Sequence, residues 1–237
     1  MGVYLKKFET QAAYEAAQSS LILPNVSLTV DNNTVHYNPS SPPTPGAVDL
    51  GLPSGVLWCD HNVGASTLEE EGYFFSWGNV SGHCLNGASD YNFGTSNTGE
   101  PYKSSSGATI TYPGSIAVGD AYDMARANMG APWRLPTNTD FQELYDNTDY
   151  EWTTINDVAG RKFMKKSDHS VYVFFPAAGY YNGSSHNGEG SGGYYWSSVL
   201  HSADDAYILH INSSGIYPQN NSHRYYGFPV RGVLADN

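Results

Sequence analysis

The feature that most constrains this chain is a mixture of two kinds of position between Tyr194 and Val233. Aromatic, small and arginine residues recur there like a packed frame, while His, Asp, Asn, Ser and Tyr stand between them in no evident order. The frame consists of Tyr194, Tyr195, Trp196, Ala206, Tyr207, Leu209, Arg224, Tyr225, Gly227, Phe228, Val230 and Arg231. Exposed positions accept substitutions at a cost usually within about ±0.5 kcal/mol, whereas core positions do not. The pattern therefore predicts a rigid core that carries a tolerant outward surface.

The composition is typical of a loop-rich, β-leaning domain. A length of 237 residues suits one large domain, or one domain with a short appendage. Charged residues make up only 14%, and the chain has 25 Gly and 19 Tyr. Tyr with Ser, Gly and Asn is also the composition of many binding surfaces, because Tyr offers broad contact at low entropic cost. Ordinary β-structure with many turns remains an open alternative.

The charge argues against a nucleic-acid partner. The formal net charge is −12, so no basic surface is available to neutralise phosphates. The one basic cluster, "KFMKK" from Lys162 to Lys166, is small and is expected to be a solvated turn between strands.

Two parts of unequal size are expected. Residues 8–20 predict a short helix, and residues 25–38 predict a β-hairpin with alternating apolar positions. The proline-rich stretch from Pro39 to Gly46 is typical of a linker. We therefore expect an N-terminal arm at 1–43 and a main domain at 44–237. Because a helix and one hairpin cannot bury a core, the arm should pack on a partner, a sister chain or the main domain.

The main domain combines short strands, long loops and two helices. One helix is expected over 119–130, with Asp120 as its cap and Gly130 as its stop, and Thr137 or Asn138 is expected to cap the next. The second helix presents Phe141, Leu144 and Tyr145 as its apolar face. Strands are expected within 47–64, 72–78, 171–181, 192–199, 206–212 and 224–233, and an irregular insert over 79–118.

Several motifs occur in an order that resembles a known family. They are "VDLGLPSGVLW", "NVGA", "YFFSWG", "WRLPTNTDFQEL", "FFPAAGYY", "GYYWSS" and "GFPVRGV". Together they resemble the C-type lectin-like fold, in the branch shared with formylglycine-generating enzymes and bacterial paralogous surface domains. The resemblance covers about residues 47–235. It implies an α+β, C-type lectin-like fold with short strands, two helices and long loops, preceded by a small helix-plus-hairpin N-terminal arm.

The ending is similar, more narrowly, to variable proteins of diversity-generating retroelements, such as phage tropism determinants. In those systems adenines of a template repeat are randomised, so Asn codons become many residues at fixed places. The resemblance implies a variable, ligand-binding set: Val199, His201, Asp204, Asp205, Ile208, His210, Asn212, Gly215, Tyr217, Asn220, Asn221, Ser222, His223 and Tyr226. Every member can arise from an Asn codon by changes in its first two bases. An ordinary Asn- and Ser-rich lectin loop could also produce this pattern.

The arm is similar to N-termini of predicted structural proteins of phages that infect gut bacteria. The first residues, "MGVYLKKFETQ", lack an apolar core, so no signal peptide is expected. No apolar run is long enough to span a membrane, so no membrane insertion is expected. These features favour a virion protein at a tail-fibre tip, released by lysis, or otherwise a protein of an extracellular surface.

The sequence does not favour an enzyme. No nucleophile-elbow pattern is present, and formylglycine-generating relatives need a reactive cysteine pair near the end of the fold, whereas Cys59 and Cys84 lie early. We expect both cysteines to be unpaired. Seven of the eight histidines are scattered without a metal motif: His61, His83, His169, His186, His201, His210 and His223. Asp204 and Asp205 are more simply solvated loop carboxylates than a calcium site. No metal and no cofactor are therefore expected.

These observations lead to a binding function. The expected protein is a phage adhesin that recognises a bacterial surface protein or polysaccharide through a diversified surface. The alternative is a fixed glycan- or protein-binding module on a bacterial cell surface. Trp196, Tyr207, Phe228 and Arg231 would support the surface from below. A homo-oligomer, such as a trimer formed through the arm, would raise avidity without new contacts.

Overall fold

The computed structural model describes residues 26–31, 34–39, 46–81, 114–202 and 204–234. The chain divides into two compact units, Met1–Thr44 and Pro45–Asn237, and the division falls within the proline-rich stretch. In the first unit, β1 (Val26–Asp31) and β2 (Thr34–Pro39) pair antiparallel, which confirms the predicted hairpin. The predicted helix at 8–20 and most of the insert at 79–118 lie outside the described residues.

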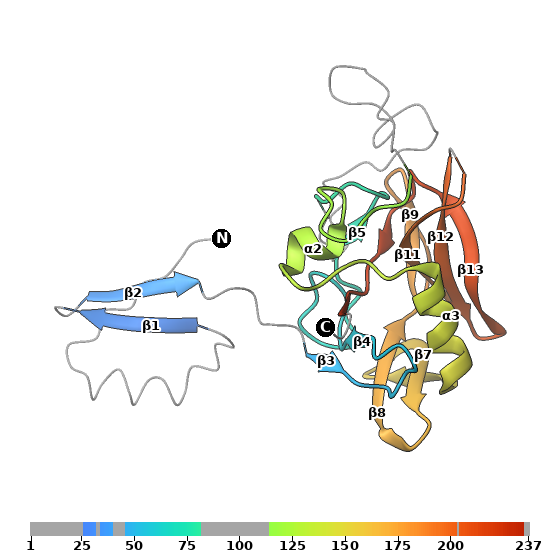
Figure 1. Ribbon diagram of the computed structural model, residues 1–237, viewed down its shortest axis with the longest axis horizontal. Helices are drawn as coiled ribbons and strands as arrows, with labels where there is room; N and C mark the ends of the chain where they lie inside the picture. The colour runs from blue at the N-terminus through green and yellow to red at the C-terminus, as the bar shows by residue number, and fades with distance from the viewer. Residues whose placement is uncertain (1–25, 32–33, 40–45, 82–113, 203, 235–237) are drawn as a thin grey trace. The chain divides into compact units, whose positions relative to one another are not determined.

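The second unit is a mixed α+β structure in which short strands predominate (Figure 1). Its described helices are α2 (Met124–Met129) and α3 (Asn138–Asn147). Its main sheet has the order β10-β9-β11-β12-β13, formed by β9 (Ala178–Asn182), β10 (Ser185–Glu189), β11 (Gly192–Leu200), β12 (Asp205–Asn212) and β13 (Gly215–His223). An antiparallel meander of β6 (Thr148–Ile155), β7 (Val158–Lys165) and β8 (Asp168–Pro176) precedes it.

Two small sheets join the end of the described chain to the beginning of the second unit. β15 (Val233–Leu234) pairs with β4 (Leu57–Cys59), which also pairs with β3 (Ala47–Val48). β14 (Phe228–Pro229) pairs with β5 (Phe74–Phe75). These contacts between distant segments close the unit around its core.

Buried side chains cover both faces of the main sheet. Tyr195, Leu209 and Ile211 belong to a cluster with Phe141 and Leu144 of α3, which lies against β12 and β13 (Figure 1). Successive side chains of a strand point to opposite faces. Their neighbours therefore enter a second cluster, which contains Trp196, Ala206, Ile208 and Phe228 together with Met124 of α2.

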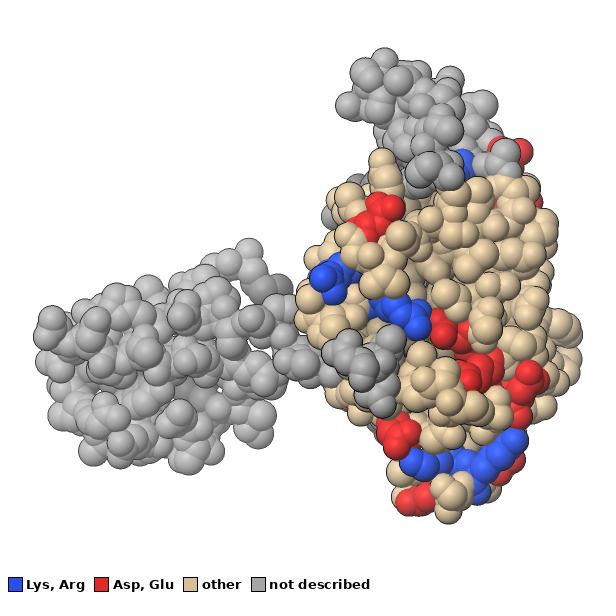
Figure 2. Space-filling model, in the orientation of Figure 1, with Lys and Arg blue, Asp and Glu red and all other residues tan. Residues whose placement is uncertain are grey.

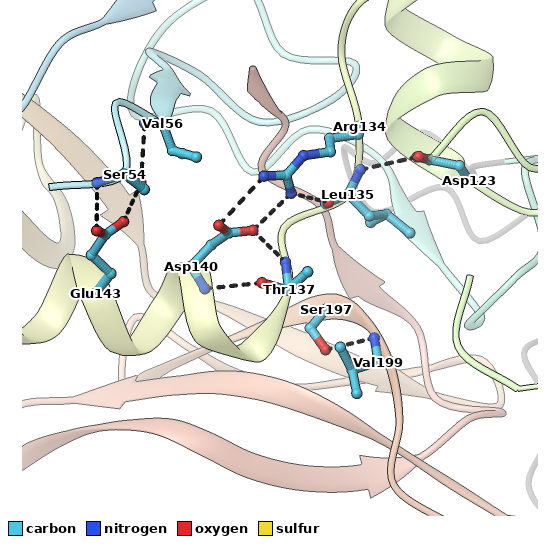
Figure 3. A network of polar contacts seen from close by, with 10 residues as sticks. All are labelled: Ser54, Val56, Asp123, Arg134, Leu135, Thr137, Asp140, Glu143, Ser197 and Val199. Atoms are coloured by element: carbon cyan, nitrogen blue, oxygen red, sulfur yellow. Dashed lines mark hydrogen bonds and ion pairs between the residues drawn. The ribbon is translucent and has the colours of Figure 1, made fainter. Parts of the chain in front are cut away.

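The start of α3 shows what the "RLPT" motif does. Thr137, one of the two residues predicted for this role, is the N-cap: its Oγ1 accepts from the backbone N–H of Asp140 at 3.0 Å, and the Asp140 carboxylate accepts from the N–H of Thr137 at 2.7 Å. Arg134 donates to the same carboxylate at 2.7 Å and to the carbonyl of Leu135 at 3.0 Å (Figure 3). This closed set of hydrogen bonds fixes the direction in which α3 leaves the preceding loop.

Loss of this cap should be measurable. We expect Thr137→Ala to lower the free energy of unfolding by about 1–2 kcal/mol, because the N–H of Asp140 loses its acceptor. Chemical denaturation monitored by circular dichroism would measure the change. Thr139→Ala, an exposed position in the same turn, is the control and should change stability by less than about 0.5 kcal/mol. Equal losses in the two variants would contradict the capping role.

The predicted cap of α2 is wrong, although its predicted end is right. Asp123, and not Asp120, caps α2 by accepting from the N–H of Arg126 at 2.9 Å, and it also accepts from the N–H of Leu135 at 3.1 Å (Figure 3). Asp120 instead accepts from the N–H of Tyr122 in the preceding turn. Gly130 ends the helix with a φ of 79°, a conformation that favours glycine.

Two strand predictions and one turn prediction differ from the structure. The stretch 171–181 breaks after Pro176 into β8 and β9, which lie in different sheets. The stretch 224–233 forms only β14 and β15, separated by irregular backbone. The basic cluster lies largely on β7 and not in a turn: Lys162 stands over the Tyr172 ring at 4.4 Å. In the described part of the chain, no helix is long and apolar enough to cross a membrane.

Candidate functional site

The predicted burial of the frame residues is confirmed for most of them. Ten of its twelve residues are buried, and Tyr194 and Tyr207 are half-buried. Trp196 donates from Nε1 to the carbonyl of Phe75 at 2.7 Å and packs on Phe228 with ring centroids 4.4 Å apart. Surface residues next to this frame are therefore held on rigid strands.

The β12–β13 hairpin gathers half of the predicted variable residues on one face. The register pairs His210 with Tyr217, Ile208 with Asn220, and Asn212 with Gly215. Residues directly opposite each other in an antiparallel pair share a face. Seven predicted positions are thus placed together: Ile208, His210, Asn212, Gly215, Tyr217, Asn220 and Ser222. An irregularity between Ile208 and His210 shifts the register within this set.

An aromatic row crosses four adjacent strands on that face. It consists of Tyr217 on β13, His210 on β12, Tyr194 on β11 and Tyr180 on β9. Tyr217 stacks on His210 with centroids 5.3 Å apart, and His210 stacks on Tyr194 at 4.5 Å. Tyr194 meets Tyr180 edge to face at 5.2 Å. Such ring pairs are favourable beyond their buried area, so the row is a pre-ordered aromatic surface.

Tyr226 extends the row toward the other end of the hairpin. Its ring lies 5.4 Å from Tyr180 and 5.8 Å from His223. His223 Nδ1 lies 2.7 Å from Oδ1 of Asp205, and the Asp205 carbonyl accepts from the N–H of His201 at 3.0 Å. Tyr226 therefore contacts the row directly, and the predicted residues His223, Asp205 and His201 are linked to it in turn through a chain of contacts.

The remaining predicted residues lie off the aromatic face. Asn221 is exposed but pairs with Tyr207, which places it on the reverse of the hairpin. Asp204 is exposed in the connection between β11 and β12. Val199 is half-buried, and its N–H donates to Ser197 Oγ at 3.1 Å beside the start of α3 (Figure 3). The structure thus assembles one main surface and leaves a minority of positions at its margin.

One predicted position is wrong as a contact residue. Ile208 is only 1% exposed and belongs to the cluster of Trp196 and Phe228. It shares a face with His210, but the polypeptide that carries Phe228 and Trp77 covers this part of the sheet. The other thirteen predicted residues are exposed or half-buried.

The surface is close to neutral in charge. β13 contains no Lys, Arg, Asp or Glu, and β12 contains only Asp205. Figure 2 shows the visible surface over β12 and β13 as largely uncharged. Burial lowers the pKa of His210 below its ordinary value, so its imidazole is neutral near pH 7. Burial, and then Tyr180, raise the pKa of Tyr194, which keeps its hydroxyl protonated. Stacking and neutral hydrogen bonds are therefore the interactions that this surface offers.

Sequence reasoning missed one member of the row and misjudged another. Tyr180 was expected only as part of an apolar strand, and Tyr194 only as frame. Both are half-buried: the Tyr194 ring stacks on His210, and the Tyr180 ring lies next to Tyr226. The doublets Tyr180–Tyr181 and Tyr194–Tyr195 could have predicted this, because neighbouring tyrosines on a strand point to opposite faces of the sheet. If one tyrosine of each doublet is in the core, the other must lie on the outer face.

Comparison with known proteins adds one partial match. Residues 143–233 match a family model described as "Domain of unknown function (DUF8237)". The matched segment contains the whole aromatic row and every predicted variable residue. No curated protein and no solved structure matches the chain.

Proposed function

We propose that this protein binds a ligand on a bacterial surface, and that the aromatic row with Tyr226 and Asn220 is the contact surface. The observation that carries the proposal is the row itself: four rings in contact across four strands, set on a buried frame. Binding energy concentrates in rigid aromatic anchors, and Tyr is prominent among them. Asn212 and Asn220 add directed hydrogen-bonding groups on the same face.

We further propose that the second unit has a C-type lectin-like fold. Supporting this are its two helices, its short strands, and the sheet that joins β15 to β4 near the start of the unit. The sequence motifs that resemble that fold form its caps and core. Arg134 and Thr137 build the start of α3, and Trp196 and Phe228 meet beneath the row.

The proposed biological role is that of a phage adhesin whose surface is diversified by a retroelement. Thirteen of the fourteen expected variable positions are accessible, so most replacements there would leave the core intact. The buried Ile208 favours the second candidate, a fixed glycan- or protein-binding module, because a randomised core position would yield unfolded variants. The two candidates can be separated in the genome. A repeat that nearly copies this part of the gene, with Asn codons at these positions and a reverse transcriptase gene beside it, would favour the diversified phage adhesin.

Binding can be tested with tyrosines matched for exposure. Tyr217 is 46% exposed on the row, and Tyr150 is 42% exposed on β6. The full chain is screened against immobilised bacterial polysaccharides and whole bacterial cells. We expect Tyr217→Ala to weaken binding by at least about ten-fold, or 1.4 kcal/mol, as is usual for an aromatic anchor. Asn220→Ala should weaken it less.

Tyr150→Ala is the control for this screen and should leave binding unchanged. Both tyrosine variants are expected to keep the circular dichroism spectrum of the parent, since each ring is largely on the surface. Binding that is lost equally with Tyr150→Ala, or kept with Tyr217→Ala, would place the ligand elsewhere.

A further inference from the structure

A cavity of about 650 Å³ lies on the other side of the β9–β10 hairpin from the aromatic row. Its walls are the loop 64–72 before β5, residues 157–159, and the hairpin itself. Tyr181 lines it, and because side chains alternate along β9, Tyr181 faces away from Tyr180 and its row. The cavity is therefore separate from the proposed ligand surface, and the inference drawn from it is independent of that proposal.

Three side chains that can ligate a metal converge in this cavity. Glu71 comes from the loop, and His186 and Glu189 come from β10. One donor atom from each lies within 4.8 Å of the other two, and His186 Nδ1 is 3.6 Å from Oε2 of Glu189. Two donors on one zinc ion lie roughly 3.4 Å apart, since each is about 2.0–2.2 Å from the metal in a tetrahedral arrangement. Small side-chain adjustments would close this set around an ion.

His186 is oriented as metal-binding histidines are. Its Nε2 lies 2.7 Å from the carbonyl oxygen of Ala178, which can only accept, so Nε2 carries the proton. Nδ1 is therefore the nitrogen left for a metal, and it is the one that lies 3.6 Å from Glu189. The ring is held between Tyr181, stacked at 4.5 Å and 2°, and Phe74, edge-on at 5.3 Å. A backbone carbonyl behind the distal nitrogen is the usual support of a ligating imidazole.

The charges around the cluster favour a cation. Glu69, Glu70 and Asp157 also line the cavity, and its described lining includes no Lys or Arg. The carboxylates of Glu71 and Glu189 lie close together in this cluster, and two like charges at such a distance repel each other. A cation between the two carboxylates would remove this repulsion.

We propose that Glu71, His186 and Glu189 bind a divalent transition-metal ion of the zinc type, with its remaining coordination positions open to the cavity. An imidazole nitrogen with two carboxylates suits such an ion better than calcium, which takes six to eight oxygen ligands. The other His-containing cluster, Cys59 with Asp60 and His61, is a poorer candidate. Burial raises the pKa of the Cys59 thiol to about 12, which opposes the thiolate that a metal requires.

Such an ion would link two segments that are distant in the sequence. Glu71 precedes β5, and its carbonyl accepts from Asn62 at 2.9 Å, while His186 and Glu189 lie on the outermost strand of the main sheet. The ion would therefore tie this edge of the sheet to the loop, next to the strand that carries Tyr180. Bound metal should raise the unfolding temperature.

Calorimetric titration of the chelator-treated full chain with ZnCl₂ tests the proposal. The expected result is saturable one-to-one binding, with CaCl₂ giving none. Glu189→Gln keeps the shape of a side chain that is 70% exposed, so it should fold like the parent and lower the affinity for Zn²⁺ by at least about ten-fold. Glu71→Gln should lower it similarly and remove the rise in unfolding temperature caused by Zn²⁺.

Glu69→Gln is the matched control, because Glu69 lines the same cavity. This substitution removes one negative charge, as Glu189→Gln does, but leaves the three proposed ligands in place. It should retain the affinity of the parent for Zn²⁺ within about two-fold, since it is outside the ligand set. No saturable Zn²⁺ binding by the parent would overturn the proposal. So would an equal loss of affinity in Glu69→Gln and Glu189→Gln, which would indicate diffuse attraction to an acidic surface.

Discussion

Arg231→Met is expected to lower the free energy of unfolding by about 3–5 kcal/mol, a large part of the stability of a typical domain. Arg231 is fully buried and donates three hydrogen bonds. Nε reaches Asn62 Oδ1 at 2.8 Å, Nη1 reaches the carbonyl of Cys59 at 3.0 Å, and Nη2 reaches the carbonyl of Phe174 at 2.7 Å. Methionine fills a similar length but leaves all three acceptors without this donor.

Urea denaturation would show the loss as a lower midpoint with an unchanged slope. Arg231→Lys should also be strongly destabilised, because one ammonium group cannot reproduce the three diverging N–H groups of the guanidinium. Lys166→Met, which removes an exposed cation from the turn after β7, is the control and should change stability by less than about 0.5 kcal/mol. A loss below about 1 kcal/mol in Arg231→Met would show that the three acceptors find other partners.

Ile208→Asn is expected to cost about 3–5 kcal/mol, because it removes buried apolar volume and buries an amide in the cluster of Trp196 and Phe228. Asparagine is the residue that an unmutated template codon would place there. The same experiment therefore measures whether position 208 can belong to a diversified set. Thermal and urea unfolding of the purified variant would give the size of the effect.

Asn220→Asp is the matched control for Ile208→Asn. Asn220 is paired directly with Ile208 across the hairpin and is half-buried. Its Oδ1 accepts from the N–H of Asn221 at 2.8 Å, a bond that aspartate can keep. We expect a change within about 0.5 kcal/mol. If the two variants have comparable stability, the core tolerates a polar group at position 208. Position 208 could then belong to the predicted variable set.

Local chemistry explains which parts of the fold could be predicted. Thr137 and Gly130 mark helix ends because a hydroxyl cap and a left-handed glycine act within a few residues of sequence. The sequence of β13, "GIYPQNNSH", contains a proline and few apolar residues, so it does not predict a strand. Its pairing with β12 forms that strand, and such long-range pairing overrides local preference.

The candidate sites depend still more on long-range pairing. Tyr180 contacts Tyr194 because β9 pairs parallel with β11, at Gly179 and Gly193. The local sequence of neither strand predicts which strand it will pair with. Glu71 is far from His186 and Glu189 in sequence, so their convergence is visible only in three dimensions. Most of the predicted variable set, in contrast, lies on the single hairpin of β12 and β13, and the regular aromatic frame made the burial of Trp196 and Phe228 predictable.

The position of β13 at the rim of the main sheet has a consequence for solubility. A rim strand can recruit strands from neighbouring molecules, and proline or a bulge there prevents such growth. β13 has both: Pro218 provides no amide hydrogen, and the pairing slips at the same place. If the hairpin is diversified as proposed, variants with apolar replacements on it should therefore not polymerise edge to edge.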